Sequence, residues 1–329
     1  MNARVVVTGA GGYVGGLLCR AYGEQYGAAS VRCAVRNPQD AARLAGQGFT
    51  VVRGDLIDPE FSRAVVADTD LVIHAAARLG HGTLGEFYKV NRGISERLAR
   101  AAASSGARMV LVSTIEAYGA FCGRTLEEDA PHRSNGHPYS DSKYAGEQAV
   151  THAYTAAGSS EFVIVRPGAI YGPGSQYWTH RYLWQAARRG GIGVLGDGGR
   201  IFPVFEDDVV DAILAASRHP NAAGRTYNLV NDEGLTWLDW ARAHHRAVGR
   251  GAPRNESVRA LRLRSRIHRC LGLPGFGRRL EVELRRAVIP HERARIDLGW
   301  DPRPFLVGMQ ACEPSRIFAD KSPKEQWVR

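Results

Sequence analysis

Residues 5–16 decide the fold and read Val5-Val6-Val7-Thr8-Gly9-Ala10-Gly11-Gly12-Tyr13-Val14-Gly15-Gly16. Three consecutive valines suit a strand that is buried on both faces of a parallel sheet. Gly9, Gly12 and Gly15 then allow a tight turn in which the backbone comes close to a ligand. A helix that begins at such a turn points its free amides at the pyrophosphate of a dinucleotide. The stretch therefore predicts a dinucleotide-binding site, although a glycine triplet by itself also occurs in other turns.

The chain beyond this stretch alternates between apolar strands and helices. This alternation predicts an α/β fold with a doubly wound parallel sheet of the Rossmann type over residues 1–174. Residues 175–329 are expected to form a smaller, mostly helical substrate-binding region that is partly interleaved with the main sheet. The further strands are expected at residues 31–35, 49–52, 71–74, 109–112, 162–166, 201–205 and 226–230.

Length and composition indicate an ordinary globular protein. The chain has 329 residues and a hydrophobic fraction of 44%, enough for a full core. No apolar run approaches the length of a membrane span, and the sequence starts with a strand instead of a leader. We therefore expect a cytoplasmic protein with no membrane partner. The five cysteines are odd in number and widely spaced, which indicates neither a disulfide framework nor a zinc site.

The formal net charge of +10 is concentrated in residues 241–295, which hold fifteen arginines and four glutamates. This region could bind an anionic partner, or arginine could simply replace lysine on solvated surfaces, since the chain has only four lysines. We favour the second interpretation and expect no nucleic-acid partner, because no binding motif accompanies the charge. Residues 257–271 have an amphipathic pattern, which we interpret as an ordinary surface helix in preference to a membrane-binding one.

Residues after the predicted strands are candidates for cofactor binding. Arg36 follows the second strand, where an acidic residue would bind ribose hydroxyls and an arginine can pair with a 2′-phosphate. Arg36 therefore favours NADP, with NAD as the alternative, unless it is a solvated loop arginine. Asp55 and Leu56 follow the third strand, where a carboxylate could accept a hydrogen bond from the adenine amine. Ala75 and Ala76 follow the fourth strand and keep the backbone close to the cofactor.

Three side chains suit chemistry at a secondary alcohol or ketone. Thr114 follows the fifth strand, and Tyr139 and Lys143 are spaced to share one face of a helix. The charge of Lys143 is expected to lower the pKa of Tyr139, so that Tyr139 can move a proton to or from a carbinol oxygen. A nicotinamide cofactor would exchange hydride at the same carbon. His74, at the end of a buried strand, is interpreted as a structural hydrogen-bonding group.

On these motifs the chain resembles the extended branch of the short-chain dehydrogenase/reductase superfamily, of the NAD-dependent epimerase/dehydratase type. The resemblance implies that Thr114, Tyr139 and Lys143 are catalytic, with Tyr139 as the general acid/base. It also implies that Lys143 holds the nicotinamide ribose, that Asn91 is a structural or water-relay residue, and that a homodimer forms through helices. The residues assigned to the cofactor are Gly9, Gly12, Tyr13, Val14, Gly15, Arg36, Asp55, Leu56, Ala75, Ala76, Asn91, Lys143 and Pro167.

Two functions follow from the resemblance. Glu116, beside Thr114, is similar to the glutamate of sugar-nucleotide dehydratases, and it favours an epimerase or dehydratase with Glu116 as a catalytic base. Glu116 could instead cap a turn or pair with an arginine. Arg36, together with Phe205 where many sugar-nucleotide enzymes have a histidine, favours an NADPH-dependent ketoreductase of the hydroxysteroid dehydrogenase or dihydroflavonol reductase type. We lean slightly to the sugar nucleotide. A nucleotide sensor without activity is disfavoured because the tyrosine and the lysine are both present.

Overall fold

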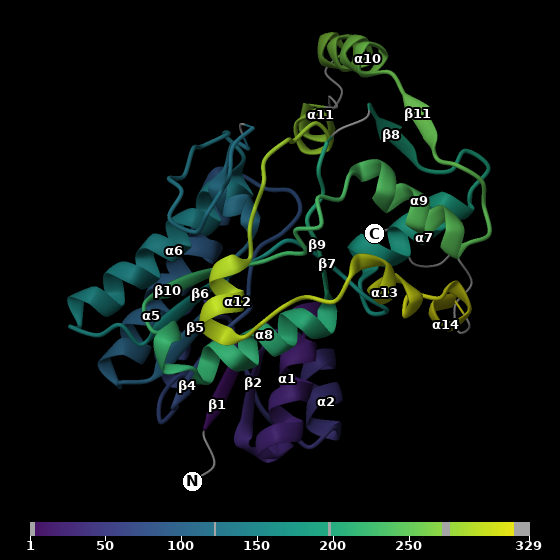
Figure 1. Ribbon diagram of the computed structural model, residues 1–329. Coiled ribbons are helices and arrows are strands. Elements are labelled where there is room, and N and C mark those ends of the chain that lie inside the picture. The colour runs from purple at the N-terminus through teal and green to yellow at the C-terminus, as the bar shows by residue number, and fades with distance from the viewer. Residues whose placement is uncertain (1–3, 122, 197–198, 272–276, 319–329) are drawn as a thin grey trace.

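A seven-stranded parallel sheet forms the centre of the protein (Figure 1). The computed structural model describes residues 4–121, 123–196, 199–271 and 277–318. The strand order is β3-β2-β1-β4-β5-β6-β10, so β1 lies between β2 and β4 and the chain reverses direction across the sheet at this point. This confirms the doubly wound α/β fold. The strands are β1 (Val5–Thr8), β2 (Val31–Val35), β3 (Thr50–Arg53), β4 (Leu71–His74), β5 (Arg108–Val112), β6 (Phe162–Pro167) and β10 (Arg225–Leu229).

Helices cover both faces of the sheet. Val5 and Val7 pack into one layer and Val6 into the other, because successive strand residues point to opposite faces. Burial on both faces explains why these strands are continuous apolar runs. The first layer contains α1 (Tyr13–Tyr26), α2 (Pro38–Gly46), α8 (Glu206–Arg218) and α12 (Glu292–Leu298), and the second contains α3 (Pro59–Val65), α5 (Gly93–Ser104) and α6 (Pro138–Ala156).

The C-terminal half contributes strands and helices to this unit. Strand β10 pairs in parallel with β6, and α8 packs against the sheet. The strand expected at residues 201–205 is shorter, since β9 covers Pro203–Phe205 and pairs with β7 (Ala169–Tyr171) outside the main sheet. The division of the chain at residue 174 stays a prediction.

A second cluster lies beyond the carboxyl ends of the strands. Its helices pack around aromatic rings: the centroids of Tyr171 and Trp240 are 5.8 Å apart, and those of Trp240 and Phe305 are 5.4 Å apart. Strands β8 (Gly193–Leu195) and β11 (Arg254–Glu256) form a small parallel pair at its edge. The helices of this cluster are α7 (Arg181–Ala187), α9 (Trp237–Ala247), α11 (Gly277–Glu283), α13 (Phe305–Gln310) and α14 (Pro314–Phe318), and α10 (Val258–Cys270) packs against α11.

Short elements complete the described chain. They are α4 (Leu84–Phe87), the 3₁₀ turns η1 (Ala28–Ser30), η3 (Ile115–Tyr118) and η5 (Pro220–Ala222), and the π-helical turns η2 (Tyr88–Arg92) and η4 (Gln176–His180). Over the described ranges, no helix combines the length and apolar character that crossing a membrane requires.

Candidate active site

The glycine-rich turn between β1 and α1 has the geometry of a dinucleotide cradle. Gly9 has φ +71°, a conformation that favours glycine, and a Cβ atom there would lie 2.7 Å from the backbone nitrogen of Ala76. A Cβ atom on Gly15 would lie 2.1 Å from the carbonyl oxygen of Gly9. Gly12 is the N-cap of α1 and has no side chain to cap the first-turn amides. These amides, including those of Tyr13 and Val14, fit a pyrophosphate, whose charge the helix dipole would stabilise.

The Tyr13 side chain binds another part of the protein and does not contribute to this cradle. Its hydroxyl donates a hydrogen bond to Glu206, at the start of α8. Burial and the charge of Glu206 raise the pKa of Tyr13 above its ordinary value. Tyr13 therefore joins α1 to α8 with its side chain, and its backbone amide is the group that could face a cofactor.

The candidate adenosine-binding residues lie at the ends of neighbouring strands. Arg36 directly follows β2 and is exposed, and Asp55 lies in the exposed turn after β3. The carboxylate of Asp55 accepts a hydrogen bond from the amide of Ile57 at 2.9 Å. The carbonyl of Leu56 accepts from Ser62 Oγ and Arg97 Nη2. Leu56 is therefore held by its backbone at this edge of the sheet.

Thr114, Tyr139 and Lys143 come together at the carboxyl ends of β5 and β4. Thr114 caps η3, and its Oγ1 accepts a hydrogen bond from the amide of Glu116 at 3.2 Å. The side chains of Thr114 and Tyr139 are hydrogen-bonded. Lys143 lies one turn further along α6, is 2% exposed, and donates from Nζ to the carbonyl of Val112 at 2.9 Å. The spacing of Tyr139 and Lys143 thus gives the shared helix face that the sequence predicts.

The pKa of Tyr139 differs from the expectation. Burial and the negative charge of Glu116 raise it above the ordinary value, and the hydrogen bond with Thr114 lowers it by less. Burial lowers the pKa of Lys143 to about 8, against the opposing effect of Glu147. The predicted lowering of the Tyr139 pKa by Lys143 is therefore not found, because loss of hydration dominates at the phenol.

His74 and Ser113 are both occupied by structural hydrogen bonds. His74 contacts Thr8 Oγ1 at 2.7 Å and Ser95 Oγ at 3.0 Å, and burial together with the charge of Lys143 lowers its pKa to about 3. Ser113 donates to Glu147, whose carboxylate also binds Arg166 at 2.6 Å and 3.0 Å. Thr114 is therefore the hydroxyl residue that remains next to Tyr139.

Asn91 lies in the π-helical turn η2 and is 1% exposed. Its Oδ1 accepts from the amide of Arg78 at 2.7 Å, and its Nδ2 donates to Ser142 Oγ at 3.0 Å. A Cβ atom on Gly146 would lie 2.6 Å from the Asn91 carbonyl oxygen, so α6 approaches this turn closely. Asn91 therefore holds α6, the helix that carries Lys143, close to η2.

Pro167 ends β6, next to the close contact between Gly168 and the Phe202 carbonyl.

Glu116 is held by two arginines. Its Oε1 accepts from Arg285 Nη1 at 2.6 Å, and its Oε2 accepts from Arg285 Nη2 at 3.0 Å and from Arg278 Nη2 at 2.6 Å. Burial alone would raise the pKa of Glu116, but the two guanidinium groups outweigh burial and lower it to about 2. Sequence reasoning missed both arginines as site residues. The only signal for them was the arginine density of residues 241–295.

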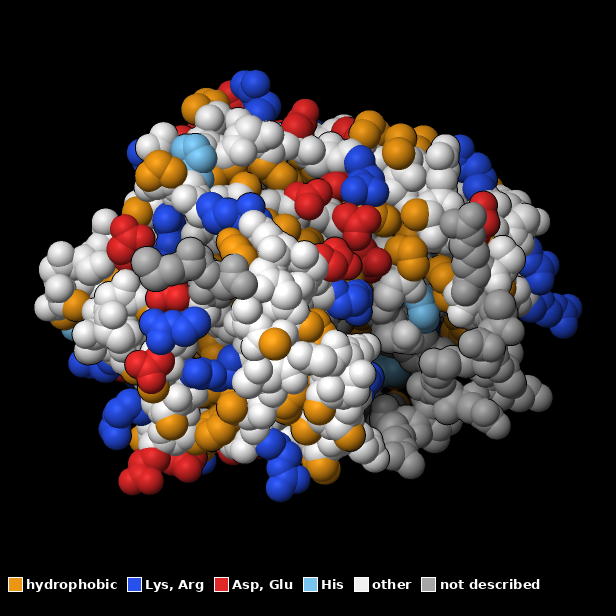
Figure 2. All heavy atoms as spheres, turned by 90° about the horizontal axis from the view of Figure 1, so that it is seen from below, with side chains coloured by type: hydrophobic (Ala, Val, Ile, Leu, Met, Phe, Trp, Pro, Cys, Tyr) orange, Lys and Arg blue, Asp and Glu red, His pale blue; other side chains and the backbone are white. Residues whose placement is uncertain are grey.

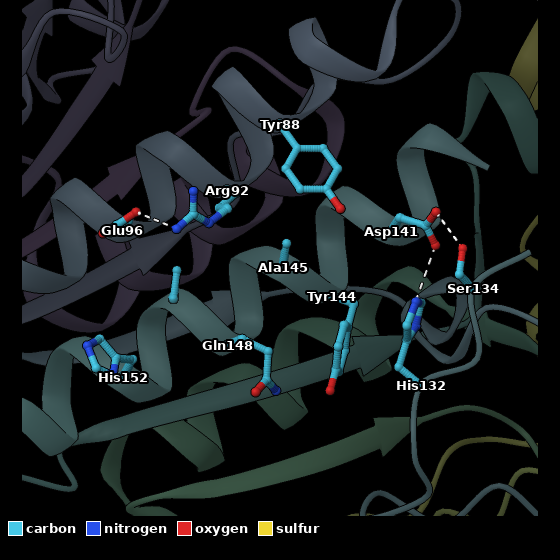
Figure 3. Close-up of a pocket in the computed structure, with 11 residues that line it drawn as sticks. Tyr88, Arg92, Glu96, His132, Ser134, Asp141, Tyr144, Ala145, Gln148 and His152 are labelled. Carbon is cyan, nitrogen blue, oxygen red and sulfur yellow. Dashed lines mark hydrogen bonds and ion pairs between the residues drawn. The ribbon is translucent and has the colours of Figure 1, made fainter. Parts of the chain in front are cut away.

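A separate pocket of about 520 Å³ lies on the outer side of α6 (Figure 3). Tyr144 stacks on His132 there at a centroid distance of 4.2 Å, and His132 contacts Asp141 at 3.2 Å. Residues 141, 144, 145, 148 and 152 face this pocket, on the side of α6 opposite to Tyr139 and Lys143. The pocket is therefore distinct from the catalytic candidates. The homodimer that the family resemblance implies stays a prediction.

The sheet order and the glycine cradle define a dinucleotide-binding protein of the Rossmann class. The chain belongs to the NAD dependent epimerase/dehydratase family, whose model matches residues 5–229, and it is an enzyme of the extended short-chain dehydrogenase/reductase type. It is 31% identical over 245 residues to the ceramide reductase of Caulobacter vibrioides, with 74% of this chain and 70% of that protein covered. It is 29% identical over 332 residues to the 2-alkyl-3-oxoalkanoate reductase of Stenotrophomonas maltophilia, with 91% and 95% covered.

A solved structure with the same fold is the UDP-glucuronic acid 4-epimerase of Bacillus cereus in complex with NAD. It superposes with a TM-score of 0.73 over 95% of this chain and 98% of the other, at 20% sequence identity. At this identity the likeness establishes the fold alone.

Proposed function

We propose that this enzyme is an NADPH-dependent reductase of a ketone on a largely apolar substrate. The observation that carries the proposal is the double ion pair of Glu116 with Arg285 and Arg278. A dehydratase needs a base that removes a proton from the carbon next to a ketone. A carboxylate with a pKa of about 2 that already accepts three hydrogen bonds is a weak base, whereas ketone reduction needs no such base. The role of Glu116 as a base stays a prediction that this geometry disfavours.

The surroundings of the candidate triad also support an apolar substrate. The ring of Phe87 packs edge-on against Tyr139 at a centroid distance of 6.4 Å. Phe121 lies under the Arg285 guanidinium at 3.9 Å, so it covers a face of the ion pair with an apolar ring. Away from the triad, Phe205 stands where many sugar-nucleotide enzymes have a histidine, and it is 3% exposed and packs on Tyr171 in the aromatic cluster. The two reductases that the chain resembles are named for alkyl and ceramide substrates, which agrees with this class.

In the proposed reaction, Tyr139 donates its phenolic proton to the ketone oxygen. Thr114, which is hydrogen-bonded to Tyr139, would hold the same oxygen and stabilise the phenolate that forms. Lys143, buried one turn away, would bind the nicotinamide ribose and supply positive charge beside the phenolate. A bound nicotinamide cofactor supplies the hydride that completes the reduction. The raised pKa of Tyr139 suits this direction, because a protonated phenol is the form that donates.

The preference for NADPH is proposed from Arg36. Its exposed guanidinium directly follows β2, where the ribose of a dinucleotide binds in this fold. A guanidinium can make a charge-assisted pair with a 2′-phosphate. The amides of Tyr13 and Val14 would bind the pyrophosphate. The rest of the cofactor site would be lined by Asp55, Ala75, Ala76 and Pro167.

A sugar nucleotide is the second candidate substrate, and the position of Arg278 favours it. The Arg278 side chain is 36% exposed and close enough to Tyr139 for its charge to lower the phenol pKa. A partly exposed guanidinium beside the reacting group could bind a diphosphate. Epimerisation or dehydration would then need a base other than an ion-paired Glu116.

The test measures NADPH oxidation with two probe substrates, a long-chain 3-oxoalkanoate ester and UDP-glucose. The proposal predicts steady NADPH oxidation with the ester and none with UDP-glucose. Turnover of UDP-glucose without net NADPH consumption, together with no reaction of the ester, would favour the second candidate and reject the first.

A further inference from the structure

Helix α10 presents an apolar ridge to solvent. Leu263, Ile267 and Leu271 are spaced four residues apart, so they lie in one row along the helix, which the backbone continues to Leu271. Their exposed fractions are 60%, 49% and 67%. On the opposite side of α10, Leu261 and Ser265 are 3% and 4% exposed. The helix therefore has a buried face toward the protein and a second apolar face that points outward.

Exposed arginines flank this ridge on both sides. At 100° per residue, Arg259, Arg262 and Arg266 lie between the ridge and the buried face on one side, and Arg264 lies on the other. The sequence of α10 contains no Asp or Glu. On the face of the protein that lies opposite α10, acidic and basic side chains are interspersed (Figure 2). The positive charge of α10 therefore contrasts with the mixed charge of that face.

The base of α10 is fixed to the protein. The preceding strand β11 pairs with β8, and Arg279 of α11 binds Glu256 at 2.8 Å, the carbonyl of Gly193 at 2.6 Å and Glu283 at 2.6 Å. Figure 1 shows α10 and α11 together at the upper end of the molecule. Arg278, next to Arg279 on α11, binds Glu116 in the candidate active site. Helix α10 is therefore anchored at its base. Helix α11, which packs against α10, connects it to the candidate active site through the contact of Arg278 with Glu116.

We propose that α10 docks on the surface of an anionic membrane, with its apolar ridge in the headgroup region. An interfacial helix combines an apolar face, a strongly basic polar face and a low overall hydrophobicity. The three apolar side chains would enter the lipid, and the flanking arginines would bind anionic headgroups. This is peripheral binding, which requires no spanning helix. It departs from the surface-helix interpretation and the absence of a membrane partner expected from the sequence.

The charge pattern favours a lipid surface over two other occupants. A two-fold contact between two copies of α10 would bring the exposed arginines of each copy toward those of the other, and like charges repel. A nucleic acid would pair with the arginines but would leave the apolar ridge against phosphate and water. Of these three occupants, the anionic bilayer is the one that satisfies both the apolar ridge and the arginines beside it.

Co-sedimentation of the full-length protein with vesicles tests this proposal. The vesicles contain phosphatidylcholine with one-third phosphatidylglycerol, or phosphatidylcholine alone. We expect binding to the anionic vesicles, and loss of that binding by at least about a hundredfold in the triple charge reversal of α10, since each surface arginine contributes roughly fivefold. The triple variant is Arg259→Glu, Arg262→Glu and Arg266→Glu, and its matched control reverses three exposed arginines elsewhere, Arg63→Glu, Arg242→Glu and Arg246→Glu.

A second pair of variants tests the ridge. Serine replacement of Leu263, Ile267 and Leu271 should lower anionic-vesicle binding at least tenfold, whereas Ile296→Ser with Leu306→Ser, at exposed apolar sites on α12 and α13, should not. Thermal unfolding of each variant shows whether it has folded. Failure of the parent protein to bind anionic vesicles would overturn the proposal. So would equal losses in the α10 variants and their controls, a change from dimer to monomer caused by the ridge variant, or binding of an oligonucleotide duplex in place of vesicles. None of these outcomes depends on the substrate of the enzyme.

Discussion

Arg285 and Glu116 lie 169 positions apart in the sequence and form a bidentate ion pair, with N–O distances of 2.6 Å and 3.0 Å. The Arg285 side chain is 5% exposed and that of Glu116 is 18% exposed, so both charges are largely removed from water. A largely buried charge that loses its partner is costly. The pair therefore fixes the arginine-rich segment against the loop that carries Thr114.

This pair predicts a pH-dependent contribution to stability. The pKa of Glu116 falls from an ordinary value of 4.5 to about 2 in the folded protein, so the stabilisation is complete above pH 4.5 and is lost as the pH falls through 2. The shift corresponds to about 3 kcal/mol at pH 7 and about 1 kcal/mol at pH 3. Urea unfolding of the parent and of Glu116→Gln should show a difference that shrinks accordingly. Glu24→Gln, at an exposed carboxylate, is the control, and a Glu116 difference that is constant with pH would contradict the pairing.

Tyr139→Phe should abolish turnover, because it removes the proton donor and leaves the groups of the glycine cradle unchanged. Affinity for NADPH, measured by fluorescence titration, should stay within a few-fold of the parent. Tyr144→Phe is the matched control, since Tyr144 lies on the same helix but faces the outer pocket and stacks on His132 (Figure 3). Similar activity in the two variants would remove Tyr139 from the mechanism.

Lys143→Ala should impair both cofactor binding and rate, because Lys143 is proposed to bind the nicotinamide ribose and to supply charge beside Tyr139. Because Lys143 is buried, thermal unfolding is measured in parallel to show that the variant is folded. Lys143→Arg keeps the charge and should recover part of the cofactor affinity. A folded Lys143→Ala variant with parental NADPH titration would reject the binding role.

Arg36→Asp should weaken NADPH binding by about tenfold to a hundredfold and leave NADH binding nearly unchanged. The charge-assisted pair is lost, worth roughly 1.5–3 kcal/mol, and a negative charge faces the 2′-phosphate. Arg63→Asp, near the C-terminus of α3, is the control, because this helix runs back toward the amino edge of the sheet. Equal changes for the two cofactors would reject the NADP assignment.

The parts of the fold that have local signals could be predicted from the sequence. The strands at residues 31–35 and 71–74 match β2 and β4, because apolar β-branched runs next to turn residues specify buried parallel strands by themselves. The glycine turn also has a local signal, since Gly9 needs its positive φ and its close contact with Ala76. The apolar run before α8 predicts a strand over residues 201–205, whereas β9 begins only at residue 203.

The surroundings of the site could not be predicted in the same way. Arg278 and Arg285 reach Glu116 only after the chain folds, and nothing near Glu116 in the sequence specifies which of fifteen arginines will pair with it. The pKa of Tyr139 likewise depends on burial, which spacing along a helix does not determine. The outward ridge of α10 needed the observed burial of Leu261 to show that two sides of the helix are apolar.

Isotope tracing tests the proposed ketone reduction most directly. The enzyme is supplied with NADPH deuterated at the transferable position and with a long-chain 3-oxoalkanoate ester in ordinary water, and the product is examined by mass spectrometry. The account predicts one deuterium at the new carbinol carbon, and the same label from the Glu116→Gln variant if it remains folded. Absence of this label, together with uptake of solvent deuterium by a sugar nucleotide in deuterated water and its loss in Glu116→Gln, would contradict the account and establish Glu116 as the base of a dehydratase.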